Sequence, residues 1–139
     1  MAGNEMKSLA FFVMWLFSGY VVSAENSSAV VNIYKADTGL VSGKLVRYYQ
    51  MLDNPCVKVQ ILKPGAGGAS RESVEFCSID GKDFSSDYAE VMLDKGEFSS
   101  NELSLVFKLL PLAQDNEQVK VCKFKIEGEK FSKPNCFGQ

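Results

Sequence analysis

Short apolar segments separated by turn residues predominate from residue 30 to the end of the chain. Residues 56–62 (CVKVQIL) and 119–126 (VKVCKFKI) are the clearest, because apolar residues alternate there with lysine or glutamine. A period of two places the apolar side chains on one face of a strand and the polar ones on the other. We therefore predict a half-buried β-strand at each of these segments.

The other apolar segments are shorter or less regular, and most also predict strands. They are residues 30–34, closed by a turn at 37–39, and residues 40–51, 74–79, 88–93 and 103–110. Residues 88–93 are too few to separate a strand from one or two helical turns, so both interpretations stay open. Further turns are expected at residues 53–55, 63–70, 80–83 and 94–96.

No segment of the chain carries a long 3.6-residue period, so the pattern predicts an all-β fold. We expect a small antiparallel β-sandwich with an immunoglobulin-like or prealbumin-like topology, stabilised by two disulfides, with a small barrel as the alternative.

The start of the chain has the three-part layout of a secretory signal peptide. Lys7 supplies a positive charge, residues 9–22 form an apolar run of 14 residues, and the small residues Ser23 and Ala24 end it. The run is shorter than the roughly 20 residues that a membrane-spanning helix needs. We predict that residues 1–24 are a cleaved signal peptide and that residues 25–139 form one secreted, extracellular domain without stable membrane insertion.

The amino-acid composition argues against several kinds of functional site. The chain has no histidine, which is the commonest general base and zinc ligand, and its only tryptophan, Trp15, lies within the predicted leader. With 15 basic and 17 acidic side chains, the net charge of −2 gives no field that would gather nucleic acid. We expect no cofactor, no metal and no enzymatic activity.

Four cysteines, all beyond the leader, are disulfide candidates in an oxidising compartment. If the strands at 56–62 and 74–79 form a hairpin, the loop midpoint near residues 66 and 67 places Cys56 opposite Cys77. Cys122 would then pair with Cys136 and fasten the tail to the last long strand. This sequential pairing is favoured, and no free thiol is expected.

The rival pairing joins Cys56 to Cys122, as in the inter-sheet bridge of immunoglobulin domains. Those domains place a tryptophan after the first cysteine and a tyrosine two residues before the second, where this chain has Lys120. Zinc modules pair cysteines two to four residues apart, and every cysteine gap here is longer.

Other polar groups have a structural and a functional interpretation. The glycine-rich residues 63–70 lack the Gly-Lys-Ser/Thr ending of a phosphate-binding loop and are expected to form a mobile hairpin loop. The lysines near the end of the chain could contact a sulfated glycan or a negative protein surface, or could simply protect a strand edge; they are Lys120, Lys123, Lys125, Lys130 and Lys133.

Four carboxylates, Asp80, Asp83, Asp87 and Glu90, are expected to form a solvated acidic loop. Asn26 begins an Asn-Ser-Ser triplet and is a candidate glycosylation site.

Four phrases of the chain resemble, in order, strand and turn segments of transthyretin-like secreted domains: residues 41–45, 56–61, 94–98 and 122–126. The resemblance implies a sandwich fold and carries no function. Those domains usually place a cysteine just after the first Gly-x-Leu, where this chain has Arg47 and Tyr48.

The leading functional hypothesis is a secreted binding protein that acts on an extracellular protein or a cell-surface partner. The alternative is a small carrier of a hydrophobic ligand, with residues 103–110 lining its cavity. A small secreted hydrolase ranks last.

Overall fold

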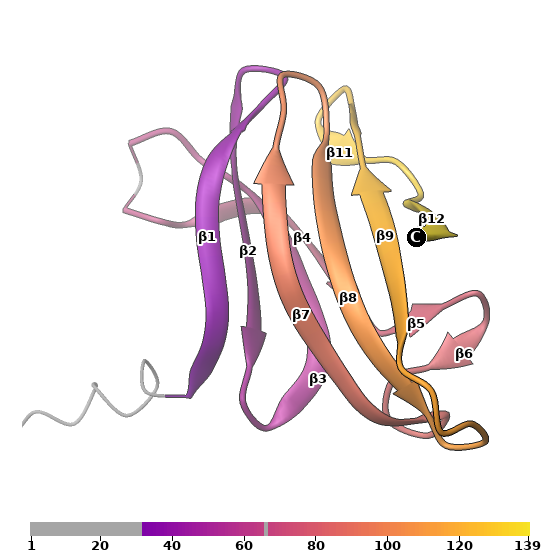
Figure 1. The fold of residues 1–139 in the computed structure, drawn as a ribbon. Coiled ribbons are helices and arrows are strands. Elements are labelled where there is room, and N and C mark those ends of the chain that lie inside the picture. The colour runs from indigo at the N-terminus through magenta and orange to yellow at the C-terminus, as the bar shows by residue number, and fades with distance from the viewer. Residues whose placement is uncertain (1–31, 66) are drawn as a thin grey trace, which may run out of the picture.

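The computed structural model describes residues 32–65 and 67–139 (Figure 1). The predicted signal peptide, the candidate glycosylation site at Asn26 and the expected strand start at residues 30 and 31 lie outside the described residues. Within the described part of the chain, no helix has both the length and the apolar character needed to cross a bilayer.

Two four-stranded antiparallel sheets form the body of the fold. The first sheet has, in spatial order, β1 (Ile33–Val41), β2 (Lys44–Met51), β3 (Asn54–Leu62) and β4 (Ser70–Phe76). The second sheet has β12 (Asn135–Gly138), β9 (Gln118–Phe124), β8 (Leu103–Pro111) and β7 (Tyr88–Phe98). Two short hairpins join β5 (Ser78–Ile79) to β6 (Lys82–Asp83) and β10 (Ile126–Glu127) to β11 (Lys130–Phe131). The prediction of an all-β, antiparallel fold is confirmed.

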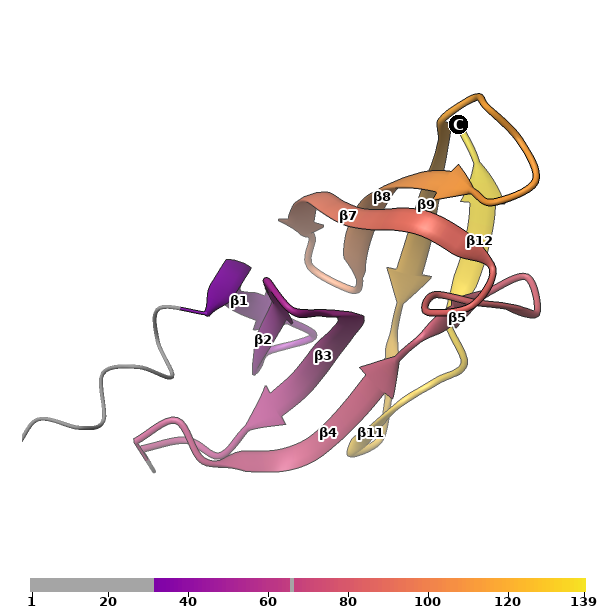
Figure 2. The same cartoon turned by 90° about the horizontal axis from the view of Figure 1, so that it is seen from below.

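The core lies between the two sheets, which Figure 2 shows as separate layers. Phe76 of β4 contacts three other rings of the core, with its ring centroid 5.6 Å from that of Phe84, 5.7 Å from Phe107 and 5.3 Å from Phe124. These rings come from both sheets and from the segment between them. Aromatic pairs at such distances add to the stabilisation that burial of their apolar surface provides.

Both favoured disulfides are present. Val57 of β3 pairs with Phe76 of β4, so the next pair in register is Cys56 and Cys77, whose Cα atoms are 4.5 Å apart. Cys122 and Cys136 are direct cross-strand partners on β9 and β12, with Cα atoms 4.0 Å apart. The hairpin register predicted from the sequence thus gave the correct pairing, and the rival Cys56–Cys122 bridge is wrong.

Two turns predicted at glycines are wrong. Residues 37–39 lie within β1, which continues to Val41, and residues 94–96 lie within β7. The strand predicted over residues 40–51 is instead interrupted by a tight turn at Ser42 and Gly43, where both residues have positive φ. Such φ values are those of a two-residue hairpin turn. The strand predicted at 74–79 likewise divides at Cys77, between β4 and β5.

The two misread glycines lie at close approaches between the sheets. A Cβ added to Gly39 of β1 would lie 2.5 Å from the ring of Phe98, and one added to Gly96 of β7 would lie 2.5 Å from the ring of Tyr48. The two rings are themselves in contact, with centroids 5.8 Å apart. Glycine is needed at both positions because an aromatic ring from the facing sheet occupies the space of a side chain.

Other predicted segments agree better with the structure, although the strand predicted over residues 119–126 ends at Phe124 and β10 begins at Ile126. Residues 88–93 form the start of β7 and are therefore a strand, and the apolar run 103–110 is the inner strand β8. Tyr48 is 3% exposed whereas the adjacent Tyr49 is half-buried, as expected for neighbours on a strand. Burial raises the pKa of the Tyr48 hydroxyl, Asp37 adds to the rise, and a hydrogen bond with the Gly96 backbone opposes it.

Side chains of the first sheet form hydrogen bonds with backbone groups along the free edge of β7. The buried side chain of Gln50 accepts a hydrogen bond from the Leu93 backbone N–H (3.0 Å) and donates one to the Val91 carbonyl (3.3 Å). The ammonium group of Lys35 donates to the carbonyl of Asp94. Beyond the strand, the Ser42 N–H donates to the Ser100 carbonyl at 2.7 Å. These contacts replace the neighbouring strand that β7 lacks on this side.

We predict that replacing Cys122 and Cys136 together by alanine frees β12 while leaving the other strands of both sheets folded. The bridge closes a loop with a sequence separation of 14, and the chain-entropy model assigns such a bridge about 3 kcal/mol. Hydrogen exchange followed by mass spectrometry should show loss of protection in residues 135–138, which the matched Cys56→Ala/Cys77→Ala variant retains. Unchanged protection of β12 without its bridge would contradict this role.

We also predict that Gly39→Ala destabilises the protein by about 1–3 kcal/mol, because the added methyl overlaps the Phe98 ring near its attachment point. Gly138→Ala is the matched control, since a Cβ at that strand position meets nothing within 4 Å, and its effect should stay within about 0.5 kcal/mol. Equilibrium urea unfolding measures both changes. Equal midpoints for the two variants would show that the close approach is absent.

Candidate functional site

A pocket of about 470 Å³ lies at the end of the molecule that holds the β2–β3 turn, and we call it the β2–β3 pocket. It is lined by the β2–β3 turn and its neighbours and by residues 84, 85 and 88–92, which lead into and begin β7. Its volume is within the range of small-molecule and side-chain binding sites. Its lining residues are Tyr34, Gln50, Met51, Leu52, Asp53, Asn54, Pro55, Phe84, Ser85, Tyr88, Ala89, Glu90, Val91 and Met92.

Gln50 holds the two sides of the pocket together. Its side-chain nitrogen donates to the Pro55 carbonyl at 2.9 Å and to the Val91 carbonyl, and its oxygen accepts from the Leu93 N–H. The residue is only 3% exposed, and both N–H donors of its side chain bond within the protein. Gln50 therefore fixes the base of the pocket through bonds within the protein and is not assigned a role in binding a ligand.

The inner wall is aromatic. Phe84 and Tyr88 are 2% and 6% exposed and meet edge to face, with ring centroids 6.2 Å apart. Burial raises the pKa of the Tyr88 hydroxyl; Lys120 lowers it, and Asp80 and Asp87 raise it. This wall is packed into the core and gives the pocket a rigid apolar back.

The rim, in contrast, leaves large apolar side chains in solvent. Tyr34 is 38% exposed and Leu52 is 64% exposed, and both line the pocket with the half-buried Met51 and Met92. The Leu52 N–H donates to the Asn32 carbonyl at 2.7 Å, which fixes the turn against the start of β1. Tyrosine and methionine side chains at a protein surface are enriched at interfaces.

Two exposed carboxylates, Asp53 and Glu90, also belong to the rim. Within residues 32–65 and 67–139, neither forms a salt bridge. The pocket thus combines an apolar wall with negative charge at its mouth.

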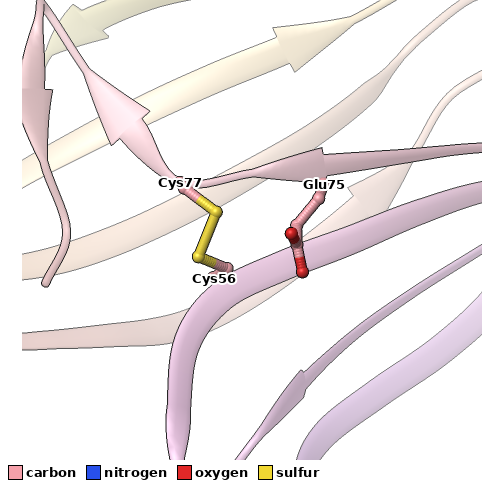
Figure 3. A group of neighbouring side chains, drawn as sticks. All are labelled: Cys56, Glu75 and Cys77. Atoms are coloured by element: carbon pink, nitrogen blue, oxygen red, sulfur yellow. A yellow bond between two sulfur atoms is a disulfide. The ribbon is translucent and has the colours of Figure 1, made fainter.

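The Cys56–Cys77 bridge has a third polar neighbour, Glu75 (Figure 3). The two sulfur atoms and a carboxylate oxygen lie within 4.8 Å of one another, the only such group of potential metal ligands in the described part of the chain. Metal ligation requires thiolates, and both sulfurs are joined in a disulfide. The group is a structural crosslink as long as that bond is intact.

The acidic residues predicted as a loop are mostly engaged within it. The Asp83 carboxylate accepts from the N–H and hydroxyl of Ser85, at 2.7 Å and 2.6 Å, and these bonds hold the pKa of Asp83 below its usual value. The Asp87 carboxylate accepts from the Asp83 N–H at 2.7 Å. Asp80 forms a salt bridge with Lys120 at 2.6 Å. Three of the four carboxylates therefore organise the segment between β5 and β7, and Glu90 is at the pocket rim.

The lysines and the glycine-rich loop separate into different environments. Lys120 reaches Asp80, whereas Lys123, Lys125 and Lys133 line a second pocket at the other end of the molecule. The loop at 63–69 joins β3 to β4, and Arg47 donates a hydrogen bond to its Gly68 carbonyl at 3.1 Å.

The apolar run once expected to line a carrier cavity is packed in the core. Leu103, Leu105, Phe107 and Leu109 are all 0% exposed, and neither of the two pockets described here includes any of them. Residues 103–110 therefore lie in the interior of the fold, and the carrier hypothesis stays a prediction.

Sequence reasoning missed Gln50, although the strand carried a signal for it. Val46, Tyr48 and Gln50 share one phase of the alternation in β2, and the first two are core residues. A polar residue at an inward position of a strand needs buried partners. The identity of those partners, on β7, was not readable from β2 alone.

Comparison of the chain with protein-family models, with curated protein sequences and with solved structures finds no significant match.

Proposed function

We propose that the protein is secreted and acts without enzymatic activity, by binding an extracellular protein or a cell-surface partner at the β2–β3 pocket. The observation that carries the proposal is the exposure of Leu52 and Tyr34, 64% and 38%, on the rim of a rigid apolar pocket. Large apolar side chains that are exposed side by side on a protein surface often mark an interaction site.

The chemistry of the rim indicates what the partner presents. An apolar side chain of the partner would enter the pocket against Phe84 and Tyr88, while Met51 and Met92 adapt to its shape. The exposed carboxylates of Asp53 and Glu90 favour a lysine or arginine beside that side chain. The partner surface proposed here is therefore an apolar anchor flanked by positive charge.

The predicted leader and the two disulfides support an extracellular place of action, since bridges persist in oxidising compartments. The finer assignment of an immunoglobulin-like or prealbumin-like topology stays a prediction.

We predict that Leu52→Asp lowers partner binding at least about tenfold, because it places a charge at the apolar anchor. The full chain is expressed in secreting cells, recovered from the medium, immobilised and exposed to extracellular and cell-surface proteins, with retained proteins quantified by mass spectrometry. Leu40→Asp is the matched control, since Leu40 is 61% exposed but lies at the opposite end of the molecule, by the β1–β2 turn.

The proposal requires a protein that is retained by the wild type and by Leu40→Asp and is lost with Leu52→Asp. Raising the salt concentration should weaken the interaction, because the rim carboxylates contribute to it. Failure to reach the medium would contradict secretion. Equal retention by both variants, or loss with Leu40→Asp alone, would contradict the assignment of the pocket.

A further inference from the structure

A second pocket, of about 370 Å³, lies between the end of β9, the strand β12 and the β7–β8 turn. We call it the lysine cleft; it is lined by Lys123, Lys125, Lys133, Ser132, Asn135 and Phe137, with Glu102 at its edge. It is at the opposite end of the molecule from the β2–β3 turn (Figure 1). Its occupant is therefore independent of the partner proposed for the β2–β3 pocket.

The Cys122–Cys136 bridge determines which side chains reach this cleft. Cys122 points into the core with 0% exposure, so its neighbour Lys123 faces outward. Lys123 is the cross-strand partner of Asn135, on the same outer face. The bridge holds β12 in this register, which keeps residues from the tail beside residues of β9.

The cleft carries an excess of positive charge. Glu102 forms a salt bridge with Lys123 at 3.3 Å, and the Lys123 ammonium also lies 5.7 Å from the centre of the Phe137 ring. In the described residues, Lys125 and Lys133 form no salt bridge. Two of the three ammonium groups are thus left to attract an anion, and the third is held in place by a carboxylate and an aromatic face.

Uncharged groups in the cleft suit a hydroxyl-rich ligand. The Ser132 hydroxyl donates to the Lys125 carbonyl at 3.2 Å, which leaves its oxygen free to accept. The amide of Asn135 offers both donors and an acceptor. Phe137 is 42% exposed, so one face of its ring can cover the C–H face of a sugar.

We propose that the lysine cleft binds a sulfated oligosaccharide, with sulfate groups at Lys125 and Lys133, hydroxyl groups at Ser132 and Asn135, and a sugar ring against Phe137. Long nucleic acid does not fit this description, because the net charge of −2 provides no field beyond the cleft itself. An acidic peptide would use the lysines but not the aromatic and hydroxyl-binding groups.

The test measures binding of a fluorescent heparin-derived hexasaccharide to the full-length secreted protein. Lys125→Gln/Lys133→Gln should weaken binding at least about tenfold. The matched control is Lys63→Gln/Lys82→Gln, which removes the same charge from two exposed lysines outside the cleft and should leave binding within about twofold.

A second variant should change the binding affinity in the opposite direction. Glu102→Gln removes the carboxylate at the edge of the cleft and frees Lys123, so it should tighten binding several-fold, an effect that loss of folding does not produce. Phe137→Ala should weaken binding without altering its salt dependence.

Three competing ligands complete the design: the same hexasaccharide after desulfation, a polyglutamate peptide and inorganic sulfate. We expect that none of the three displaces the fluorescent hexasaccharide at a concentration at which the unlabelled intact hexasaccharide does. It is overturned by absence of hexasaccharide binding, by equal losses in the two lysine pairs, by equal binding of the desulfated form, or by stronger competition from polyglutamate.

Discussion

The free edge of β7 is the constraint on which the rest of the structure depends. An edge strand leaves backbone N–H and C=O groups without a neighbour, and burying them unpaired would cost about 1–3 kcal/mol each. Gln50 pairs with the Val91 carbonyl and the Leu93 N–H, and Lys35 pairs with the Asp94 carbonyl. Two side chains of the first sheet thus complete the edge of the second sheet and fix the distance between the layers.

Two glycines allow the close approach of the sheets that these hydrogen bonds require. Gly39 and Gly96 leave room for the rings of Phe98 and Tyr48, so the strands can come near enough for side chains to reach the facing backbone. The same glutamine joins the β2–β3 turn to β7 through the Pro55 carbonyl, which gives the β2–β3 pocket its fixed base. At the other end, the Cys122–Cys136 disulfide holds β12 on β9 and so fixes the side chains that line the lysine cleft.

The sequence was most informative where structure is decided locally. Alternation located β3 and β9, and the hairpin register paired Cys56 with Cys77. The turns predicted at Gly39 and Gly96 were wrong, because the sequence does not distinguish a glycine in a turn from a strand glycine that lies against an aromatic ring of the facing sheet. The candidate sites were less predictable still: the lysines were noticed as a patch, but the β2–β3 pocket requires a turn and a distant strand to meet, which no local pattern encodes.

The exchange rate of the Leu93 amide proton, measured by NMR in the native protein, tests the role of the β7 edge most directly. If Gln50 completes that edge, this amide exchanges as slowly as the amides of the inner strand β8 and loses that protection in Gln50→Ala. Gln60→Ala should leave the protection intact, since the Gln60 side chain bonds to Arg47 and Ser73 of its own sheet. Exchange of the wild-type Leu93 amide at the rate of exposed loop amides, or equal rates in both variants, would contradict the account.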